Sequence, residues 1–314
     1  MRSYFQSRRN KIFYYLTGHF RRLIPEKINI LRYEKILNKF ENSENNQLFN
    51  RINYYLNFND RFSIDSSYIS IKDISMNDGS YSLDLYRYSR FFNEDLKLKY
   101  LFGDVNYEPK YPALVKSRPV STGSNSILLK LNELRHFYFI KSDIPFSQKK
   151  NALVWRGGAH QVHRKEFLSR FYKKSLIIDV GEPSKSNREG IYPAQFLTIN
   201  EQLRYKFILS IEGNDVATNT KWIMSSNSLC FMTKPRYETW YMEGALKPNF
   251  HYVCIKDDYS DLEEKLNYYI EHSDEAEFII NNAKNYVRQF MNKDQELFLN
   301  VKVLEKYFIL SGQL

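Results

Sequence analysis

Two adjacent glycines beside an arginine form the first candidate for a binding loop. The residues Arg156-Gly157-Gly158 directly follow a short apolar run that predicts a strand over residues 152–155. Glycines let backbone N–H groups come close to a ligand, and arginine offers a planar, permanently charged fork for a diphosphate. The alternative is a tight turn with a surface arginine, and this loop alone does not decide between the two.

A second glycine turn follows a predicted strand over residues 205–211 and leads into a predicted helix over residues 216–226. Free N–H groups and the positive end of the helix dipole at such a helix start favour an anion. The candidate binding residues here are Gly213, Asn214, Asp215, Asn219 and Lys221. The loop matches neither the nucleoside triphosphatase pattern G-x-x-x-x-G-K-[ST] nor the dinucleotide pattern G-x-G-x-x-G. An ordinary capped helix explains these residues equally well.

Two carboxylates follow other predicted strands. Glu238 comes after the strand over residues 229–232, near an expected helix start, where it could accept hydrogen bonds from both hydroxyls of a ribose. It could equally stabilise that helix N-terminus. Asp104 follows Gly103 and a predicted strand over residues 97–102. A carboxylate there could take the proton from an acceptor hydroxyl that attacks a sugar's anomeric carbon, although aspartate after glycine is also a common turn residue.

Metal-binding and hydrolase patterns are missing from the sequence. There is no D-x-D motif and no His/Asp/Glu cluster with the spacing of a divalent-ion site, so we expect no metal. Negative charge on a departing diphosphate would instead be stabilised by arginine, lysine and helix N-termini. No G-x-S-x-G elbow or Cys–His arrangement supports a hydrolase. Cys230 and Cys254 lie in apolar runs without C-x-x-C spacing, which favours a reducing cytoplasm.

The elements that must position these loops alternate between strands and helices in the second half of the chain. Strands are predicted over residues 97–102, 137–140, 152–155, 175–180, 205–211, 229–232 and 251–255. Helices are predicted over residues 164–173, 216–226, 261–270, 274–290 and 294–310. This alternation predicts β-α-β crossovers and a mostly parallel sheet, in which ligands bind at the carboxyl ends of strands.

The length of 314 residues suggests two domains, and the charge is concentrated at one end. Residues 1–40 carry ten basic and two acidic side chains, a net +8 of the total +10, interleaved with aromatic and aliphatic residues. This pattern suits a basic amphipathic segment on an anionic membrane, but also a nucleic-acid-binding arm or a helix packed on the body. Residues 41–60 are a polar connection. No apolar stretch approaches a membrane span and no signal-peptide pattern is found, so we expect a cytoplasmic protein.

The order of the loops along the chain resembles glycosyl transferase family 90. The resemblance covers about residues 95–290 and is strongest for its bacterial lipopolysaccharide core enzymes. The motifs that carry it are Gly103-Asp104, Lys116-Ser117-Arg118-Pro119, Leu134-Arg135-His136, Trp155-Arg156-Gly157-Gly158, the run from Tyr205 to Asp215, Ser225-Ser226-Asn227-Ser228, Glu238-Thr239-Trp240, His251-Tyr252-Val253 and the run from Asp257 to Leu262.

The resemblance implies an α/β, GT-B-like fold of two Rossmann-like domains facing across a cleft, and inversion at the anomeric carbon with a UDP-sugar donor. It places Asp104 at the family's catalytic base and Arg156 near the diphosphate. Eukaryotic members carry Ser-x-Arg after the second glycine turn. This chain has Ala217-Thr218-Asn219 instead, which leaves Lys221 as the nearest cation.

These observations lead to one predicted function and one alternative. The chain is expected to be a cytoplasmic-face transferase that adds glucose or galactose to a heptose of the lipopolysaccharide inner core. Residues 1–40 would lie on the inner membrane, 41–150 form the acceptor-side domain and 151–314 the nucleotide-sugar domain. Lys116 and Arg118 would meet phosphates of the lipid A-core acceptor, and no nucleic acid is expected. The alternative is a non-catalytic basic protein that binds membrane or nucleic acid.

Overall fold

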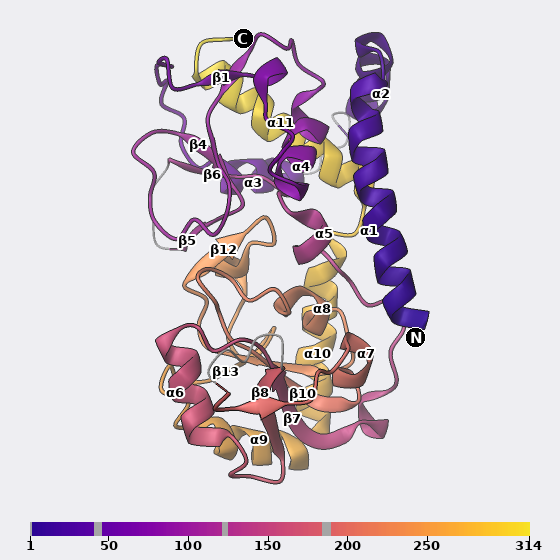
Figure 1. The fold of residues 1–314 in the computed structure, drawn as a ribbon, viewed down its shortest axis with the longest axis vertical. Coiled ribbons are helices and arrows are strands. Elements are labelled where there is room, and N and C mark those ends of the chain that lie inside the picture. The colour runs from indigo at the N-terminus through magenta and orange to yellow at the C-terminus, as the bar shows by residue number, and fades with distance from the viewer. Residues whose placement is uncertain (1, 41–45, 121–124, 184–189) are drawn as a thin grey trace. The chain divides into compact units, whose positions relative to one another are not determined.

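The computed structural model describes residues 2–40, 46–120, 125–183 and 190–314, with backbone only at 2–10, 26–27 and 46. The chain is mixed α/β with parallel sheets, as predicted. It divides into two compact units (Figure 1). Unit 1 comprises Met1–His136, Tyr237–Tyr241 and Phe290–Leu314, and unit 2 comprises Phe137–Arg236 and Met242–Gln289.

Unit 1 contains a small parallel sheet with the order β3-β4-β6. Its central strand is an uninterrupted buried run, Ala113–Val115, which is typical of a strand covered on both faces. Two antiparallel pairs, β1 with β2 and β5 with β12, complete the strands of the unit. The strands are β1 (Ile69–Ser70), β2 (Lys97–Leu98), β3 (Tyr100–Leu101), β4 (Ala113–Val115), β5 (Ser117–Pro119), β6 (Ser126–Leu128) and β12 (Tyr237–Thr239).

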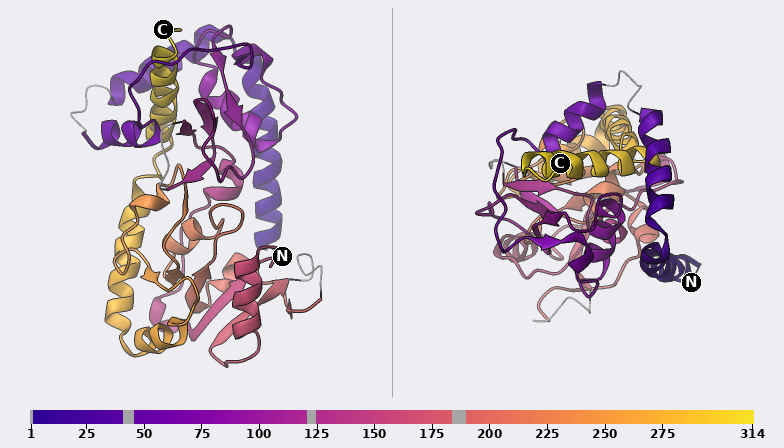
Figure 2. Two further views of the ribbon diagram at one scale, coloured as in Figure 1. Left: turned by 90° about the vertical axis from the view of Figure 1, so that its left-hand side faces the viewer. Right: turned by 90° about the horizontal axis from the view of Figure 1, so that it is seen from above.

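The helices of unit 1 come from the first 136 residues of the chain and from its C-terminal end. They are α1 (Arg2–Phe20), α2 (Glu26–Phe40), α3 (Asn46–Tyr55), α4 (Ser80–Ser89), α5 (Glu133–His136) and α11 (Lys293–Leu310), with the short 3-10 turns η1 (Arg21–Leu23) and η2 (Ile71–Asp73). The last helix, α11, packs against α2, α3 and α4 (Figure 2). Among the described residues, no helix combines the length and apolarity needed to cross a membrane.

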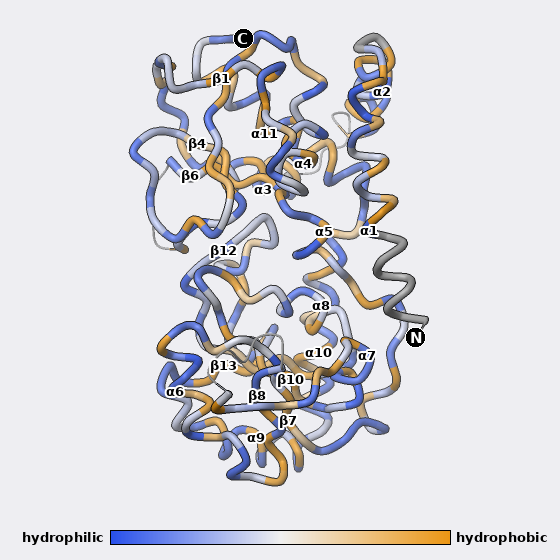
Figure 3. The backbone as a smooth tube through the Cα atoms, in the orientation of Figure 1, coloured by the Kyte–Doolittle hydropathy of each residue, from blue (hydrophilic) through white to orange (hydrophobic). Residues whose placement is uncertain are grey.

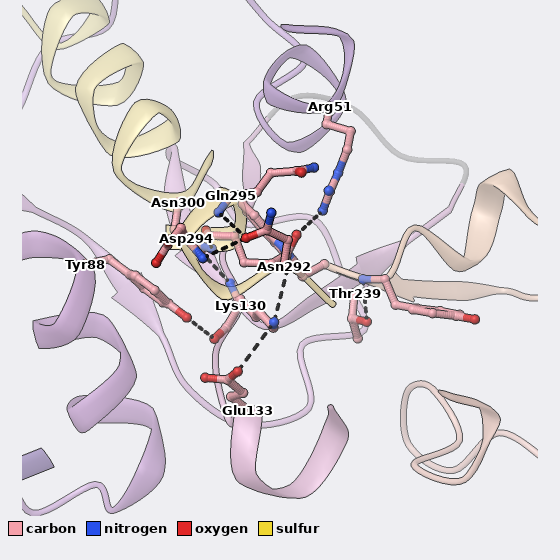
Figure 4. Close-up of polar contacts among 12 residues, drawn as sticks. Arg51, Tyr88, Lys130, Glu133, Thr239, Asn292, Asp294, Gln295 and Asn300 are labelled. Atoms are coloured by element: carbon pink, nitrogen blue, oxygen red, sulfur yellow. Dashed lines mark hydrogen bonds and ion pairs between the residues drawn. The ribbon is translucent and has the colours of Figure 1, made fainter. Parts of the chain in front are cut away.

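A buried polar network anchors α11 in unit 1. Glu296 accepts hydrogen bonds from Arg51 and from the Trp240 indole, both at 2.7 Å, and pairs with Lys130 at 3.1 Å. Lys130 also reaches Glu133 at 3.4 Å (Figure 4). Because these contacts are long-range, α11 belongs to unit 1 rather than to the unit that precedes it in sequence. Unit 1 therefore combines the first 136 residues with the C-terminal end of the chain.

Unit 2 is built on one parallel sheet with the order β13-β11-β10-β7-β8-β9. Its strands are β7 (Lys150–Arg156), β8 (Ile178–Pro183), β9 (Pro193–Ala194), β10 (Tyr205–Ser210), β11 (Leu229–Met232) and β13 (Val253–Cys254). Its helices are α6 (Val162–Phe171), α7 (Ile199–Gln202), α8 (Thr220–Met224), α9 (Leu262–Glu271) and α10 (Ser273–Arg288), with 3-10 turns η3 (Phe146–Gln148) and η4 (Glu243–Ala245). Phe207 and Phe231 of the sheet lie in one apolar core with Phe167 of α6.

Several predicted elements need correction. Residues 97–102 form two short strands in different sheets, β2 and β3, rather than one. Residues 137–140 are not a strand. The connection predicted over residues 41–60 contains helix α3, which buries Leu48 and Ile52 and is followed by the buried Leu56. Residues 41–45 of this connection lie outside the described ranges. The helix predicted from residue 216 begins only at Thr220.

Candidate active site

The two glycine loops predicted to bind an anion lie at neighbouring strand ends of unit 2. Strand β7 pairs in parallel with β10 on one side and with β8 on the other. Strands β7 and β10 lie at the centre of the sheet. The chain adds β8 and β9 beyond β7 in one direction and β11 and β13 beyond β10 in the other. The β7–β10 boundary is therefore the topological switch point of the sheet, the usual ligand-binding place in an open parallel sheet.

Arg164 of α6 joins the two loops. Its guanidinium donates to the carbonyls of Gly158 at 3.0 Å, Ile211 at 2.7 Å and Glu212 at 2.8 Å. Burial lowers the pKa of Arg164 to about 10, so it stays charged at neutral pH. Arg164 is not among the residues that the sequence predicted for this site. Its signal was an arginine in the first turn of the helix that follows the first glycine loop.

Packing explains why the first loop needs glycine at position 157. A Cβ at Gly157 would lie 2.6 Å from the Trp155 ring, closer than any real contact. A Cβ at Gly213 would lie 3.4 Å from an Arg164 nitrogen, an ordinary van der Waals contact, so packing does not require glycine there. The next backbone amide after the first glycine pair, that of Ala159, donates to Glu182 at 2.6 Å. The loops are thus held close to each other by packing and hydrogen bonds.

The Arg156 guanidinium binds groups of the neighbouring strand and of the chain beyond it. It pairs with Asp179 at 2.6 Å and donates to the backbone carbonyls of Asp179 at 2.8 Å and Gln195 at 2.9 Å. These contacts fasten the end of β7 to β8 and to the chain beyond it. The predicted planar fork is present at the strand end, but its donors bind protein groups.

The second loop differs from its prediction in two respects. Because α8 starts at Thr220 and has five residues, no helix dipole begins at Val216. Lys221 is fully buried and pairs with Glu243 at 2.5 Å. The structure therefore does not support a contact between Lys221 and a diphosphate.

The remaining predicted residues of this loop shape the turn. The amide of Gly213 donates to the Asp215 carbonyl at 2.9 Å, and Asn214 accepts from Gln161 at 2.9 Å. Asn219 donates to the Leu209 carbonyl at 3.0 Å. These side chains and amides lie where the sequence placed them, at the carboxyl end of β10.

A cation that sequence reasoning missed lies beside the second loop. Arg236 donates from its backbone N–H and its Nε to the two carboxylate oxygens of Glu212, at 2.9 and 3.0 Å. Its side chain is 55% exposed, unlike those of Arg156 and Lys221. His163 contacts the Glu212 carbonyl at 2.9 Å, and burial lowers its pKa, which favours the neutral ring.

The carboxylate predicted to act as a base lies in unit 1. Gly103 has φ +97°, a conformation that glycine adopts without strain, and this turn directs the chain into Asp104. The Asp104 carboxylate is partly exposed and pairs with the buried Lys116 ammonium at 2.6 Å. An opposite charge at this distance stabilises the ionised carboxylate. The pairing gives Lys116 a partner within the protein, where an acceptor phosphate had been predicted.

Glu238 does not begin a helix, contrary to the prediction. It lies in β12, paired in register with Arg118 of β5, and is buried. Arg118 binds its carboxylate at 2.8 Å, and Tyr54 donates a hydrogen bond to it. Arg118 also donates to the Tyr54 carbonyl at 2.8 Å. These buried contacts do not support the predicted roles of Glu238 at a ribose or Arg118 at an acceptor phosphate.

In the described ranges, no group of three or more His, Cys, Asp or Glu side chains is arranged to hold a metal ion. The site residues divide between the units. Asp104, Lys116, Arg118 and Glu238 belong to unit 1, whereas the two glycine loops with Arg156, Arg164 and Arg236 belong to unit 2.

Glycine loops and arginines at the switch point of a parallel α/β sheet lie where such sheets usually bind ligands, an arrangement that many nucleotide-binding enzymes share. Sequence comparison identifies the family: the model of glycosyl transferase family 90 matches residues 130–311. The chain belongs to glycosyl transferase family 90, as its motif order predicted, and it is a glycosyltransferase.

Three relatives illustrate the range of the family. O-glucosyltransferase LpsA of Dichelobacter nodosus is 46% identical over 232 residues, which cover 74% of this chain and 73% of the relative. Protein O-glucosyltransferase 3 of Homo sapiens is 30% identical over 51% of this chain and 32% of its own length. Protein O-glucosyltransferase 2 of Danio rerio is 23% identical over 52% of this chain and 33% of its own. The match therefore spans about a third of each animal relative.

Proposed function

We propose that this chain is an inverting, metal-independent transferase that moves a hexose from a UDP-sugar to a heptose of the lipopolysaccharide inner core. The observation that carries the proposal is the 46% identity, over about three quarters of both chains, to a bacterial protein named O-glucosyltransferase LpsA. That name favours glucose over galactose as the transferred sugar.

The donor site of the proposal is the switch point of unit 2. Backbone amides of the Gly157 and Gly213 loops, with Asn214 beside them, would face the diphosphate. Arg236, whose side chain is half exposed, would supply the direct positive charge. Arg156 and Arg164 would add positive potential from behind the loops. Such fixed donors stabilise the negative charge of a leaving UDP without reorganisation during the reaction.

The base of the proposal is Asp104. Its carboxylate takes the proton of the acceptor hydroxyl while that oxygen forms a bond to the anomeric carbon. The bond from this carbon to the UDP oxygen breaks, and UDP leaves with the bonding electrons. Lys116 is a positioning residue, whose ammonium lies 2.6 Å from this carboxylate. The parallel sheets of the two units support a GT-B arrangement with unit 1 on the acceptor side and unit 2 on the donor side.

The acceptor of the proposal is a lipid A-core oligosaccharide, which places the enzyme at the cytoplasmic face of the inner membrane. Residues 1–40 are the segment that would meet that membrane. We expect no metal requirement and no nucleic-acid partner. The competing proposal is a non-catalytic basic binder, which the family membership disfavours.

The test is transfer from UDP-glucose and UDP-galactose to delipidated, heptose-terminated core oligosaccharide, with and without a chelator. Asp104→Asn should bind UDP with unchanged affinity by calorimetry while its turnover falls by about 10²–10⁴-fold. Undiminished turnover would remove Asp104 from the mechanism, and loss of activity with the chelator would refute metal independence. Stabilisation of the protein by an oligonucleotide, but not by UDP, would favour the competing proposal.

A further inference from the structure

A buried arginine in unit 1 has charged atoms without a partner. Arg90 caps the C-terminus of α4 and is only 6% exposed. Its Nε and Nη1 atoms are buried and make no hydrogen bond to any described residue. Its guanidinium lies over the Phe91 ring at 5.0 Å, which orients the group without satisfying its donors. An unpaired buried cation is costly, so this arrangement calls for an anion.

Two further arginines lie around Arg90. Arg21 of η1 also has a buried Nη1 without a hydrogen bond among the described residues. Burial and the charges of Arg21 and Arg32 together lower the pKa of Arg90 to about 10. Burial and the charge of Arg87 likewise lower the pKa of Arg21. Arg87 itself is paired with Glu133, so its own charge is compensated.

The segment around this cluster exposes apolar side chains. One side of α1 is packed against the protein, because Tyr14 donates to Asp84 of α4 at 2.5 Å and Gly18 is buried. The opposite side of α1 carries the exposed apolar side chains. Residues four apart share one helix face, so Ile12, Leu16 and Phe20 form a stripe on α1. We define the apolar ridge as Ile12, Phe13, Leu16, Phe20, Leu23, Ile28 and Leu31, of which even the most hidden, Leu16 and Ile28, are 54% exposed. Figure 3 shows hydrophobic and hydrophilic residues interleaved along this part of the chain.

We propose that Arg21, Arg32 and Arg90 form a phosphate site for the headgroup of an anionic phospholipid, beside which the apolar ridge enters the bilayer surface. Charge selects this occupant, because the exposed side chains that flank the ridge include Lys11, Arg22, Arg32 and Lys35. A second copy of the chain would bring the same cations together, and a nucleic acid would leave the ridge in water. The inference rests on the proposed function only for the lipid-linked acceptor that brings the enzyme to a membrane.

The test is co-sedimentation of the full chain with vesicles of phosphatidylcholine alone or mixed with phosphatidylglycerol. Arg90→Gln should weaken binding to the anionic vesicles by about tenfold or more, because charge-assisted hydrogen bonds are lost. Arg61→Gln is the matched control, because Arg61 is an exposed arginine of the same unit. This variant should weaken binding to the anionic vesicles by about fivefold at most. Phe13→Ser with Phe20→Ser should abolish binding to both vesicle types.

A thermal-unfolding measurement separates a ligand site from a structural role. Without ligand, Arg90→Gln should unfold at the same or a higher temperature, because it removes a buried charge that has no partner. Inorganic phosphate should stabilise the wild-type chain more than this variant. Arg90→Gln should also transfer sugar to the delipidated acceptor at the wild-type rate, so a failure of the proposed function would be recognised separately.

Four results would overturn the inference. Equal losses of vesicle binding in Arg90→Gln and Arg61→Gln would mean diffuse charge attraction rather than a specific binding site. A lower unfolding temperature for Arg90→Gln with unchanged vesicle binding would mean a structural arginine. Stabilisation by phosphate without vesicle binding would mean a site for a free anion. Binding of an oligonucleotide in preference to anionic vesicles would mean a nucleic-acid surface.

Discussion

The buried pair of Lys221 and Glu243 gives the sharpest test of how charge is used in unit 2. The two side chains are 0% and 2% exposed, and their charged atoms lie 2.5 Å apart. Removing one partner of such a pair leaves an uncompensated buried charge and typically costs about 3–5 kcal/mol. Lys221→Met should therefore destabilise the chain by about that amount and lower its melting temperature by on the order of 10 °C.

The double variant Lys221→Met/Glu243→Leu is the matched control. Because it removes both charges and fills the space with apolar side chains, it should recover most of the lost stability, with a coupling of about 2 kcal/mol or more in the double-mutant cycle. The assay is urea unfolding of the four proteins, with UDP binding by calorimetry at a temperature where all are folded. UDP affinity should stay within about twofold of wild type, since nothing at the loop surface changes.

The opposite pattern would refute this reasoning. If Lys221→Met lost less than about 1 kcal/mol of stability but more than about tenfold in UDP affinity, Lys221 would reach the diphosphate in solution. The sequence-based prediction for that residue would then be right, and the buried pair would not describe the state that binds the donor.

Two other substitutions test the site and the packing of unit 1. Gly157→Ala should cost about 1–3 kcal/mol in urea unfolding and weaken UDP binding, because its Cβ would lie 2.6 Å from the Trp155 ring; wild-type behaviour would show that the loop relaxes freely. Burial and the charge of Glu133 raise the pKa of Asp84 to about 7, above its value near 4 in the unfolded chain. The contribution of Asp84 to folding stability is therefore fully present below about pH 4 and is lost as the pH rises to 7. Asp84→Asn should remove that loss, and an unchanged pH profile of stability would contradict it.

The sequence by itself determined the features that depend on local patterns. Contiguous apolar runs predicted the strands β7, β10 and β11, because a strand buried on both faces needs apolar residues at every position. Glycines marked the loops after β7 and β10, and the order of these motifs identified the family. The sequence also predicted that Asp104 follows a glycine turn, and Gly103 forms that turn in the structure.

Only the tertiary structure decided which charges are available to a ligand. The sequence does not distinguish three buried charged residues, Lys221, Arg118 and Glu238, from solvent-exposed ones. Each is buried against a partner that lies more than 20 residues away in the chain. Likewise, only the fold directs Arg164 onto three loop carbonyls, whereas it leaves the Arg236 side chain exposed. Pairing of buried charges is non-local, because the cost of desolvation is offset only by partners that folding brings together.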